Sequence, residues 1–300
     1  MSRITILLVS DIHGRIDNID GLHKWLTERQ RIETIDFIIA SGDLVTIDHE
    51  VDDEIVKERL RLMFKMCYEY RVSEYVCGNH DPSEAFYMYA YDELGKQRSA
   101  GSDLVKNFHN KVIDIAPGLS MVGFGGSTEA ALRNEPSKVV WPAYPLDTES
   151  LLSKQLPILF SKVPKQNDIM LVTHVGPVDV STTDVNKYPN DLKERISGGS
   201  AAISRHIANE SPRKTPDDVD VLTLTVNVHG HTHFPFGISH IGRTVIVNPG
   251  PLRDGRFAIL TLERHSQDEL IHKDTSRKRL TEALQRKQVW IVSGVEFYLI

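Results

Sequence analysis

The chain has 300 residues, of which 40% are hydrophobic and 25% are charged, and its formal net charge is −6 at pH 7. This composition is typical of a globular protein and excludes a disordered or collagen-like chain, and the acidic balance gives no overall electrostatic footprint for nucleic acid. Only two cysteines are present, Cys67 and Cys77, so neither a disulfide framework nor a CxxC metal site is expected.

No segment is apolar over the roughly 18–20 residues that a membrane-spanning helix needs. The longest apolar runs, such as residues 4–9, have the length of a strand. The N-terminal segment lacks the layout of a signal peptide, because Asp11 interrupts its apolar run. We therefore expect a cytoplasmic protein with reduced, buried cysteines and no membrane partner.

The first third of the chain alternates short apolar runs with amphipathic stretches. The apolar runs are rich in branched residues, as buried parallel strands are. Strands are predicted at residues 4–10, 36–41 and 74–77, and helices at 17–31, 50–71 and 82–94. Alternation of this kind predicts a mainly parallel sheet with helices outside it.

The second part of the chain is richer in strands. A hairpin is expected over residues 112–125, and further strands are predicted at 168–173, 222–230, 234–240, 244–248 and 256–263. Helices are predicted at 146–163, opened by a cap at Asp147 or Thr148 and disturbed at Pro157, and at 200–210. Residues 126–146 and 175–199 have no clear period and are expected to be long surface loops that rim a site.

The composition changes near residue 264. The tail is polar, with a short helix expected around residues 280–284, and it ends in the apolar run 289–300. Exposure of such a run to water is unfavourable, so it should pack on the core or on a second subunit. We predict a main domain over residues 1–265 and a C-terminal extension over 266–300, through which the protein could form an oligomer.

Polar clusters follow five of the predicted strands, each just past the carboxyl end of its strand. They are Asp11 with His13, Gly42 with Asp43, the run GNHD at 78–81, His174, and the run GHTH at 230–233. Open α/β sheets place their ligand sites at this edge. We therefore expect the five clusters to meet in space although they lie far apart in the sequence.

The clusters combine two aspartates, one asparagine and four histidines. Carboxylates and imidazoles together suit manganese, iron or zinc better than magnesium or calcium. Seven ligands are too many for one tetrahedral ion, and they suit two ions that share a bridging ligand. Two divalent ions, two aspartates and a bridging hydroxide leave a net charge of about +1, which would attract an anionic ester.

The ordered series DIH (11–13), GD (42–43), GNHD (78–81), TH (173–174) and GHTH (230–233) resembles that of the calcineurin-like metallophosphoesterase family. The resemblance covers roughly residues 1–265 and includes VNPG at 247–250. It implies an α/β fold, a two-sheet αββα sandwich, and two divalent metal ions. It also implies that a metal-bound hydroxide hydrolyses a small phosphodiester or phosphomonoester.

The resemblance carries over to single positions. The first metal would be held by Asp11, His13 and His233, the second by Asn79, His174 and His231, and Asp43 would bridge both. His80 would lie near the leaving group, where it acts as a general acid or stabilises phosphate charge. Asp81 would orient His80 and keep it partly protonated.

Other polar residues stand outside this series. Arg15, Arg133 and Arg253 are candidate phosphate contacts, because guanidinium groups match phosphate geometry. His229 adjoins the GHTH run, and we expect it to have a structural role or to support a ligand.

Two departures narrow the substrate class. The residues after Asp43 are LVTI, without the Asp-Arg-Gly stretch of the protein serine/threonine phosphatases, and GNHD stands where those enzymes have GNHE. A phosphoprotein phosphatase is therefore disfavoured, and the series looks like the branch that includes cyclic-nucleotide phosphodiesterases and other small-molecule phosphoesterases. A manganese-dependent nuclease and a non-catalytic scaffold like the family's retromer subunit stay open, although the acidic charge disfavours nucleic acid and the complete ligand set disfavours a scaffold.

Overall fold

The computed structural model describes residues 2–46, 74–81, 106–132, 135, 137–145, 147–186, 195–210, 224–266 and 288–300. The predicted helices at 50–71, 82–94 and 280–284 lie outside the described residues, as do Cys67 and Arg133. Within the described segments, no helix has both the length and the apolar character that crossing a membrane requires.

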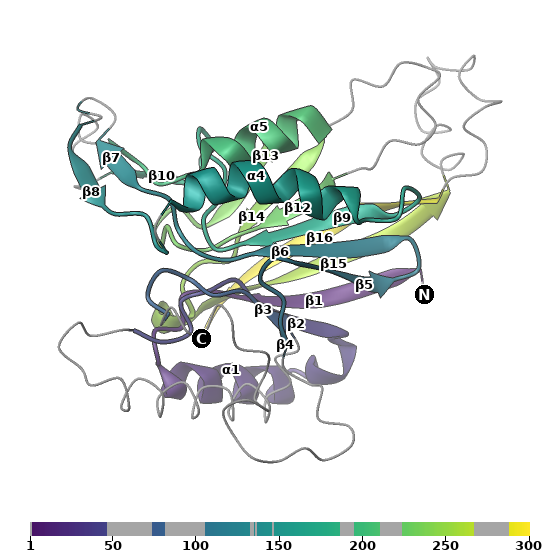
Figure 1. The fold of residues 1–300 in the computed structure, drawn as a ribbon. Coiled ribbons are helices and arrows are strands. Elements are labelled where there is room, and N and C mark those ends of the chain that lie inside the picture. Colours follow the sequence, from purple (N-terminus) through teal and green to yellow (C-terminus); the bar gives the residue numbers. More distant parts are fainter. Residues whose placement is uncertain are drawn as a thin grey trace, which may run out of the picture.

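Two six-stranded sheets lie face to face, and helices cover both outer faces (Figure 1). The first sheet has the order β16 (Gln288–Leu299), β15 (Arg256–Ser266), β1 (Arg3–Val9), β2 (Phe37–Ala40), β3 (Glu74–Tyr75) and β4 (Lys106–Asn107). The second has the order β13 (Gly237–Ile241), β14 (Thr244–Asn248), β12 (Leu224–Val228), β9 (Asp168–Thr173), β6 (Leu119–Phe124) and β5 (Lys111–Ala116). This arrangement confirms the predicted two-sheet sandwich.

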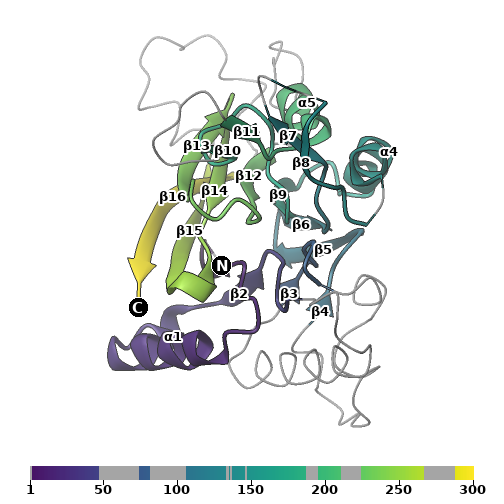
Figure 2. The same cartoon turned by 90° about the vertical axis from the view of Figure 1, so that its left-hand side faces the viewer.

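The helices form the outer layers. Helix α1 (Ile16–Glu28) lies against the first sheet, and helices α4 (Thr148–Ser161) and α5 (Ala201–Glu210) lie over the second (Figures 1 and 2). Two short 3-10 turns precede strands of the first sheet: η1 (Ile32–Thr34) comes before β2, and η3 (Leu252–Asp254) comes before β15. The four layers are therefore helix, sheet, sheet and helices.

Strand β1 is apolar without interruption from Ile6 to Val9, and the packing of its two faces explains this run. Its residues Ile4, Ile6 and Leu8 pack between the two sheets, and Leu7 and Val9 pack on the side of α1. Successive side chains of a strand point to opposite faces, so a strand that is buried on both faces needs an unbroken apolar run. Each fully buried side chain of this size contributes roughly 1.5–3 kcal/mol to the free energy of unfolding.

The direction of the strands determines where the polar clusters lie. Strands β1, β2 and β3 are mutually parallel, and so are β6, β9, β12 and β14 of the second sheet. The carboxyl ends of parallel strands share one edge of a sheet. The predicted clusters therefore leave both sheets at the same end of the sandwich.

A third, smaller sheet corrects the two predicted long loops. It has the order β10 (Asp184–Asn186), β11 (Arg195–Ser197), β7 (Ala130–Leu132) and β8 (Val139–Trp141). Ala130, Leu132 and Ile196 are buried in it and Trp141 packs against them. Strands of three residues show no readable period, and β7 pairs with β11 from a distant part of the chain. The sequence therefore gives no local signal for this sheet.

Helix α4 and two strand boundaries also differ from the predictions. The helix continues through Pro157, although proline removes one helical hydrogen bond. At its start, Asp147 makes no capping hydrogen bond and the Thr148 hydroxyl donates to the carbonyl of Pro145 at 2.6 Å. Strand β13 begins at Gly237 rather than at residue 234, and β15 continues to Ser266.

The C-terminal apolar run forms strand β16, which pairs antiparallel with β15 from Gln288 to Leu299. Its Trp290 is buried, and the indole N–H donates to the carbonyl of Pro117 at 3.2 Å. The backbone N–H of Trp290 donates to the carboxylate of Asp168 at 2.7 Å. The division of the chain at residue 265 and an oligomer through this tail stay predictions.

A half-buried histidine near the GNHD loop gives the protein an acid-sensitive contact. The backbone N–H of Gly125 donates to Nδ1 of His109 at 2.8 Å. Burial, with a contribution from the charge of Lys111, lowers the pKa of His109 from 6.5 to about 4. The unfolded chain therefore binds a proton at a pH where the folded protein does not, and stability falls as the pH drops below 6.5.

Replacing His109 with asparagine is expected to remove this contribution, because the amide oxygen accepts the same hydrogen bond but does not titrate. Between pH 7 and pH 5 the wild type should lose about 2 kcal/mol more than His109→Asn in the free energy of unfolding, measured by urea denaturation. His240 is exposed and serves as the control, since His240→Asn should keep the wild-type pH slope. Equal slopes for His109→Asn and the wild type would contradict the prediction.

Candidate metal centre

The loops that follow β1 and β2 are joined by their backbones. The N–H of Asp11 donates to the carbonyl of Gly42, and the N–H of His13 donates to the carbonyl of Asp43, both at 2.9 Å. These bonds continue the parallel pairing of the two strands beyond their last residues. They place the side chains of Asp11, His13 and Asp43 beside one another.

Further bonds join the two sheets at this end. The N–H of Gly230 donates to the carbonyl of His174 at 2.9 Å within the second sheet. Across the sandwich, the N–H of His231 donates to the carboxylate of Asp11 at 3.2 Å, and Nδ1 of His174 donates to the carbonyl of Ser41 at 2.8 Å. The clusters from both sheets therefore form one site.

Four side chains form a compact group of metal-binding atoms. Asp11, His13, Asp43 and His233 each offer a ligand atom, and these atoms all lie within 4.8 Å of one another. Nε2 of His233 lies 3.1 Å from Oδ1 of Asp11 and 3.3 Å from Nε2 of His13. Imidazole and carboxylate donors directed at one point are what a divalent transition metal requires. The group contains the three residues predicted for the first metal and the predicted bridge.

The residues predicted for the second metal lie on the other side of Asp43. Nε2 of His174 is 3.3 Å from Oδ2 of Asp43 and 3.0 Å from Oδ1 of Asn79. The ring of His231 lies against that of His174, with their centroids 5.1 Å apart. Oδ2 of Asp43 also lies 3.7 Å from Nε2 of His13. This oxygen therefore stands between the histidines of the two sets, where a bridging ligand is expected.

The backbone is strained at four of these positions. Asp11, His13, Asp43 and His231 have φ angles of 51°, 50°, 51° and 66°, in the left-handed region. A residue other than glycine in this backbone conformation raises the energy of the fold by about 1–3 kcal/mol, and such strained residues concentrate at functional sites. The tight turns formed in this way place the four side chains close to one another.

The two aspartates are held in the ionised state. Burial by itself raises the pKa of each carboxyl group. For Asp43 the neighbouring charge and hydrogen bond of His174 outweigh burial and bring the pKa well below the ordinary range. For Asp11 the hydrogen bond from His233 and the charge of that ring outweigh burial and lower the pKa. Both carboxylates are therefore negative at neutral pH, as metal ligands must be.

The histidines of the site differ in their protonation. Burial lowers the pKa of His13 to about 4 and that of His231 to about 3, so both rings are neutral at pH 7. Burial also disfavours the charged form of His174, but the carboxylate of Asp43 outweighs it and raises the pKa to about 9. Without a cation, the proton on His174 balances charge between the aspartates. A bound metal would displace it.

One buried atom supports the fit of a metal directly. Nε2 of His231 is buried and has no hydrogen-bond partner among the described residues. A buried nitrogen without a partner costs about 1–3 kcal/mol, so native proteins rarely keep one without a reason. Coordination of a cation would satisfy this atom. The residues present therefore fit a metal centre.

The glycine of the GNHD run is required by close packing. A Cβ atom at Gly78 would overlap the carboxylate and the backbone nitrogen of Asp43. Only a residue without a side chain lets this loop approach the predicted bridging ligand so closely. The backbone N–H of His80 then reaches Oδ1 of Asp43 at 2.7 Å.

The two predicted catalytic residues have different surroundings. His80 is half-buried, and its ring lies 5.0 Å from the ring of His13 between centroids. Asp81 is fully buried, and its carboxylate accepts the backbone N–H groups of Val45 at 3.0 Å and Gly78 at 2.7 Å. Burial and the negative charge of Asp43 raise the pKa of Asp81 to about 7. Within the described residues, Asp81 makes no hydrogen bond to the ring of His80, so it fixes the loop rather than the imidazole.

Two of the three candidate phosphate contacts lie beside carboxylates of neighbouring residues. Arg15 forms an exposed ion pair with Asp17 at 2.7 Å, and Arg253 lies 3.8 Å from Asp254. His229 is buried, and its two ring nitrogens are hydrogen-bonded to Thr182 and to the carbonyl of Gly230. This structural arrangement is the role expected for His229.

The structure also brings in residues that the sequence analysis did not single out. Nδ1 of His13 is hydrogen-bonded to the hydroxyl of Thr46 at 2.9 Å, and the indole of Trp141 lies 5.3 Å from the ring of His231. Thr46 stands three residues after Asp43, so its position beside the GD pair was a usable signal. Trp141 lies in the segment expected to be a loop, and nothing local pointed to it.

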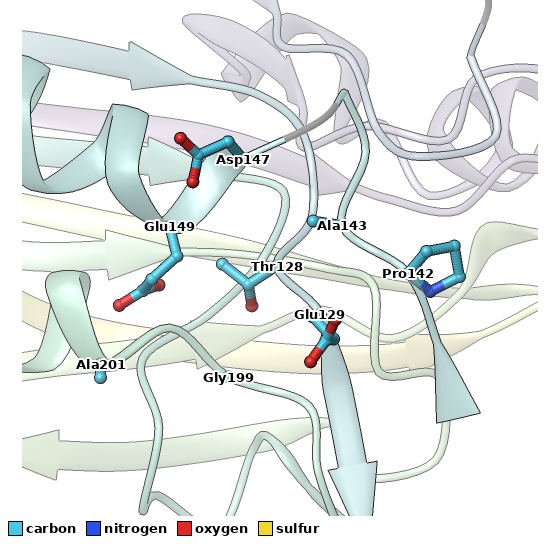
Figure 3. Close-up of a pocket in the computed structure, with 8 residues that line it drawn as sticks. All are labelled: Thr128, Glu129, Pro142, Ala143, Asp147, Glu149, Gly199 and Ala201. Atoms are coloured by element: carbon cyan, nitrogen blue, oxygen red, sulfur yellow. The ribbon is translucent and has the colours of Figure 1, made fainter. Parts of the chain in front are cut away.

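A cavity of about 700 Å³ lies beside the small sheet and the start of α4 (Figure 3). Its lining residues are Thr128, Glu129, Pro142, Ala143, Asp147, Glu149, Gly199 and Ala201. The carboxylate of Glu149 accepts hydrogen bonds from the Ser200 hydroxyl and the Ala202 N–H, both at 2.6 Å, at the first turn of α5. Three of the lining residues are carboxylates, and their negative charge would repel a phosphate.

Comparison with known proteins agrees with this fold. TT1561 from Thermus thermophilus is 17% identical with a TM-score of 0.53, and the alignment covers 87% of this chain and 94% of that one. A dimetal phosphatase from Danio rerio is 12% identical with a TM-score of 0.53 and coverages of 88% and 95%. These identities establish similarity of fold alone, and no curated protein matches the sequence. The family model for calcineurin-like phosphoesterases matches residues 4–235, so the chain belongs to the calcineurin-like phosphoesterase family.

Proposed function

We propose that the protein is a two-metal phosphoesterase that hydrolyses a small phosphodiester or phosphomonoester. The observation that carries the proposal is the meeting of both ligand sets at the Asp43 carboxylate. Its Oδ2 lies 3.7 Å from Nε2 of His13 and 3.3 Å from Nε2 of His174. The mixed imidazole and carboxylate set favours manganese, iron or zinc.

Bound divalent ions would activate a water molecule and clamp the phosphoryl oxygens. The chain's own residues do the rest. Asp11 and Asp43 are kept ionised and neutralise part of the cation charge. His13 and His231 are neutral at pH 7 and present ring nitrogens rather than positive charge. The site therefore keeps enough positive charge to attract a phosphate ester.

His80 is the proposed proton donor. Its backbone N–H is bound to Oδ1 of Asp43, which fixes the residue beside the bridging position while the imidazole stays outside the ligand set. A ring N–H of His80 would pass its proton to the leaving oxygen of the ester. Asp81 supports this indirectly, because its carboxylate ties the GNHD loop to Val45.

The organic part of the ester would meet apolar surface at the rim. Phe234 directly follows the ligand His233, and 80% of its surface is exposed. Ring surface next to a cation site offers contact for a planar or apolar leaving group. This supports a small organic ester as substrate. The cytoplasmic location stays a prediction from the sequence.

Hydrolysis of bis-p-nitrophenyl phosphate and of p-nitrophenyl phosphate tests the proposal. With Mn²⁺ we expect turnover of at least one ester. We expect a chelator to abolish this turnover, because the proposed reaction needs the metal as a Lewis acid to polarise the phosphate. Preference for the diester would establish a phosphodiesterase, and preference for the monoester a phosphatase. Mn²⁺ binding measured by calorimetry is the control. Binding without turnover of these esters or of alkyl phosphate esters would contradict catalysis and favour a scaffold.

A further inference from the structure

The ligand histidines differ in how their rings are held. A metal-ligating histidine usually donates a hydrogen bond from the N–H of its other ring nitrogen to a neighbour, which fixes the ring and its tautomer. His13 follows this rule through Thr46 at 2.9 Å, and His174 follows it through the carbonyl of Ser41 at 2.8 Å. His231 does not, because its ring has no hydrogen bond to any part of the chain that the structure describes.

The ring of His231 is held by two aromatic neighbours instead. The ring of His174 lies on one side, with centroids 5.1 Å apart and planes at 64°. The indole of Trp141 contacts it edge to face, with centroids 5.3 Å apart and planes at 85°. Edge-to-face pairs at this separation are more favourable than the burial of their area alone.

Trp141 is itself fixed by the small sheet. It is the last residue of β8 and packs against the cluster of Ala130, Leu132 and Ile196. A Cβ atom at Gly198 would lie 3.2 Å from the indole and 2.8 Å from the Thr232 side chain, so a glycine is needed where the backbone passes between them. The small sheet therefore supports the indole against the GHTH loop.

We infer that Trp141 is the positioning residue for His231 and that the small sheet serves to hold it there. The contact fixes the plane of the imidazole beside the ring of His174, and its buried Nε2 has no other partner among the described residues. This inference rests on the proposed function, because it takes His231 as a metal ligand. It assigns to the small sheet the role that a hydrogen bond performs at His13 and His174.

The indole N–H does not explain why the ring is there. Nε1 of Trp141 is buried and has no hydrogen-bond partner among the described residues. Phenylalanine would remove this unpaired donor and keep an aromatic edge against His231. Leucine would fill part of the space and remove the aromatic contact. The two substitutions therefore separate the ring contact from the general packing of the small sheet.

Metal affinity is the direct test. We expect Trp141→Leu to weaken Mn²⁺ binding, measured by calorimetry, by roughly 10–100-fold, as loss of a group that orients a ligand typically does. Trp141→Phe should stay within about threefold of the wild type and unfold no earlier in urea, because removing an unsatisfied buried donor costs little. Wild-type affinity in Trp141→Leu, or equal losses in both variants, would overturn the inference.

Trp290 provides a matched control. It is buried at the opposite end of the sandwich, where it contacts Asp168 and Pro117 at the start of strand β9 and the turn before β6. Trp290→Phe makes the same chemical change and removes a hydrogen bond, so it should lower stability without changing Mn²⁺ affinity. A loss of affinity in Trp290→Phe as large as in Trp141→Leu would mean that general destabilisation explains the effect.

Fluorescence gives a readout that a purely structural role would not produce. Bound Co²⁺ quenches a nearby indole, so the Trp141 component should be quenched in the wild type and in Trp290→Phe and be missing in Trp141→Phe. An unchanged response in Trp141→Phe would overturn the placement of the indole. A wild type that binds metal but hydrolyses no ester would overturn the proposed function alone, and a wild type that binds no metal would overturn both.

Discussion

Asp43→Asn is expected to abolish tight binding of the second cation and to lower ester hydrolysis by about 10³-fold or more. The carboxylate is the point where both ligand sets meet, and its Oδ2 faces the histidines of both. An amide offers one neutral oxygen in place of two negative ones. Loss of bridging charge removes several kcal/mol of transition-state stabilisation, and each 1.36 kcal/mol is a factor of ten in rate.

The measurement is metal content by elemental analysis beside the hydrolysis rate of the better p-nitrophenyl ester. Asp20→Asn is the control, because Asp20 is exposed on α1 and the same change of charge there should alter neither quantity. Urea unfolding in chelator tests whether the fold survives. Full activity and two bound ions in Asp43→Asn would contradict the assigned bridge.

His80→Ala should behave differently from a ligand variant. The substitution keeps the backbone N–H that binds Asp43, so metal content should be unchanged. Removal of a general acid costs about 10²–10⁴-fold in rate. The loss should be large for an alkyl phosphate ester, whose leaving oxygen needs a proton, and much smaller for a p-nitrophenyl ester, whose leaving group departs as a stable anion.

Two substrates therefore identify the role of His80. The ratio of the rate losses for an alkyl and an aryl ester of the same phosphate is the quantity to measure. His240→Ala is the matched histidine control, since His240 is exposed on β13. Equal losses on both substrates would mean that His80 stabilises phosphate charge instead of donating a proton. Loss of metal from His80→Ala would make it a supporting residue of the centre.

The sequence was sufficient to predict the strands and the site residues where an apolar run is directly followed by polar residues. Buried parallel strands need unbroken apolar runs, so β1, β2, β6 and β9 could be recognised from composition alone. Polar residues directly after such runs must lie at the carboxyl edge of the sheet. The convergence of Asp11, His13, Asp43 and His233 follows from those two facts together with the ordered motifs.

Contacts between short segments that lie far apart in the chain could not be predicted from the sequence pattern. The small sheet consists of strands of three residues, which carry no period, and its pairing of β7 with β11 exists only in the folded chain. The partners of Asp81 are backbone N–H groups, which have no signature in the sequence. The unusual support of His231 by Trp141 was hidden for the same reason.

The sequence by itself determined the fold class, the family and the set of candidate ligands, because apolar patterning and ordered motifs are local properties of the chain. Only the tertiary structure decided how each ligand is oriented. Ser41, Thr46 and Trp141 hold three of the histidines, and each reaches its partner through the packing of separate loops. Orientation depends on distances of a few ångströms between such loops, and those distances exist only after the sheets have packed against each other.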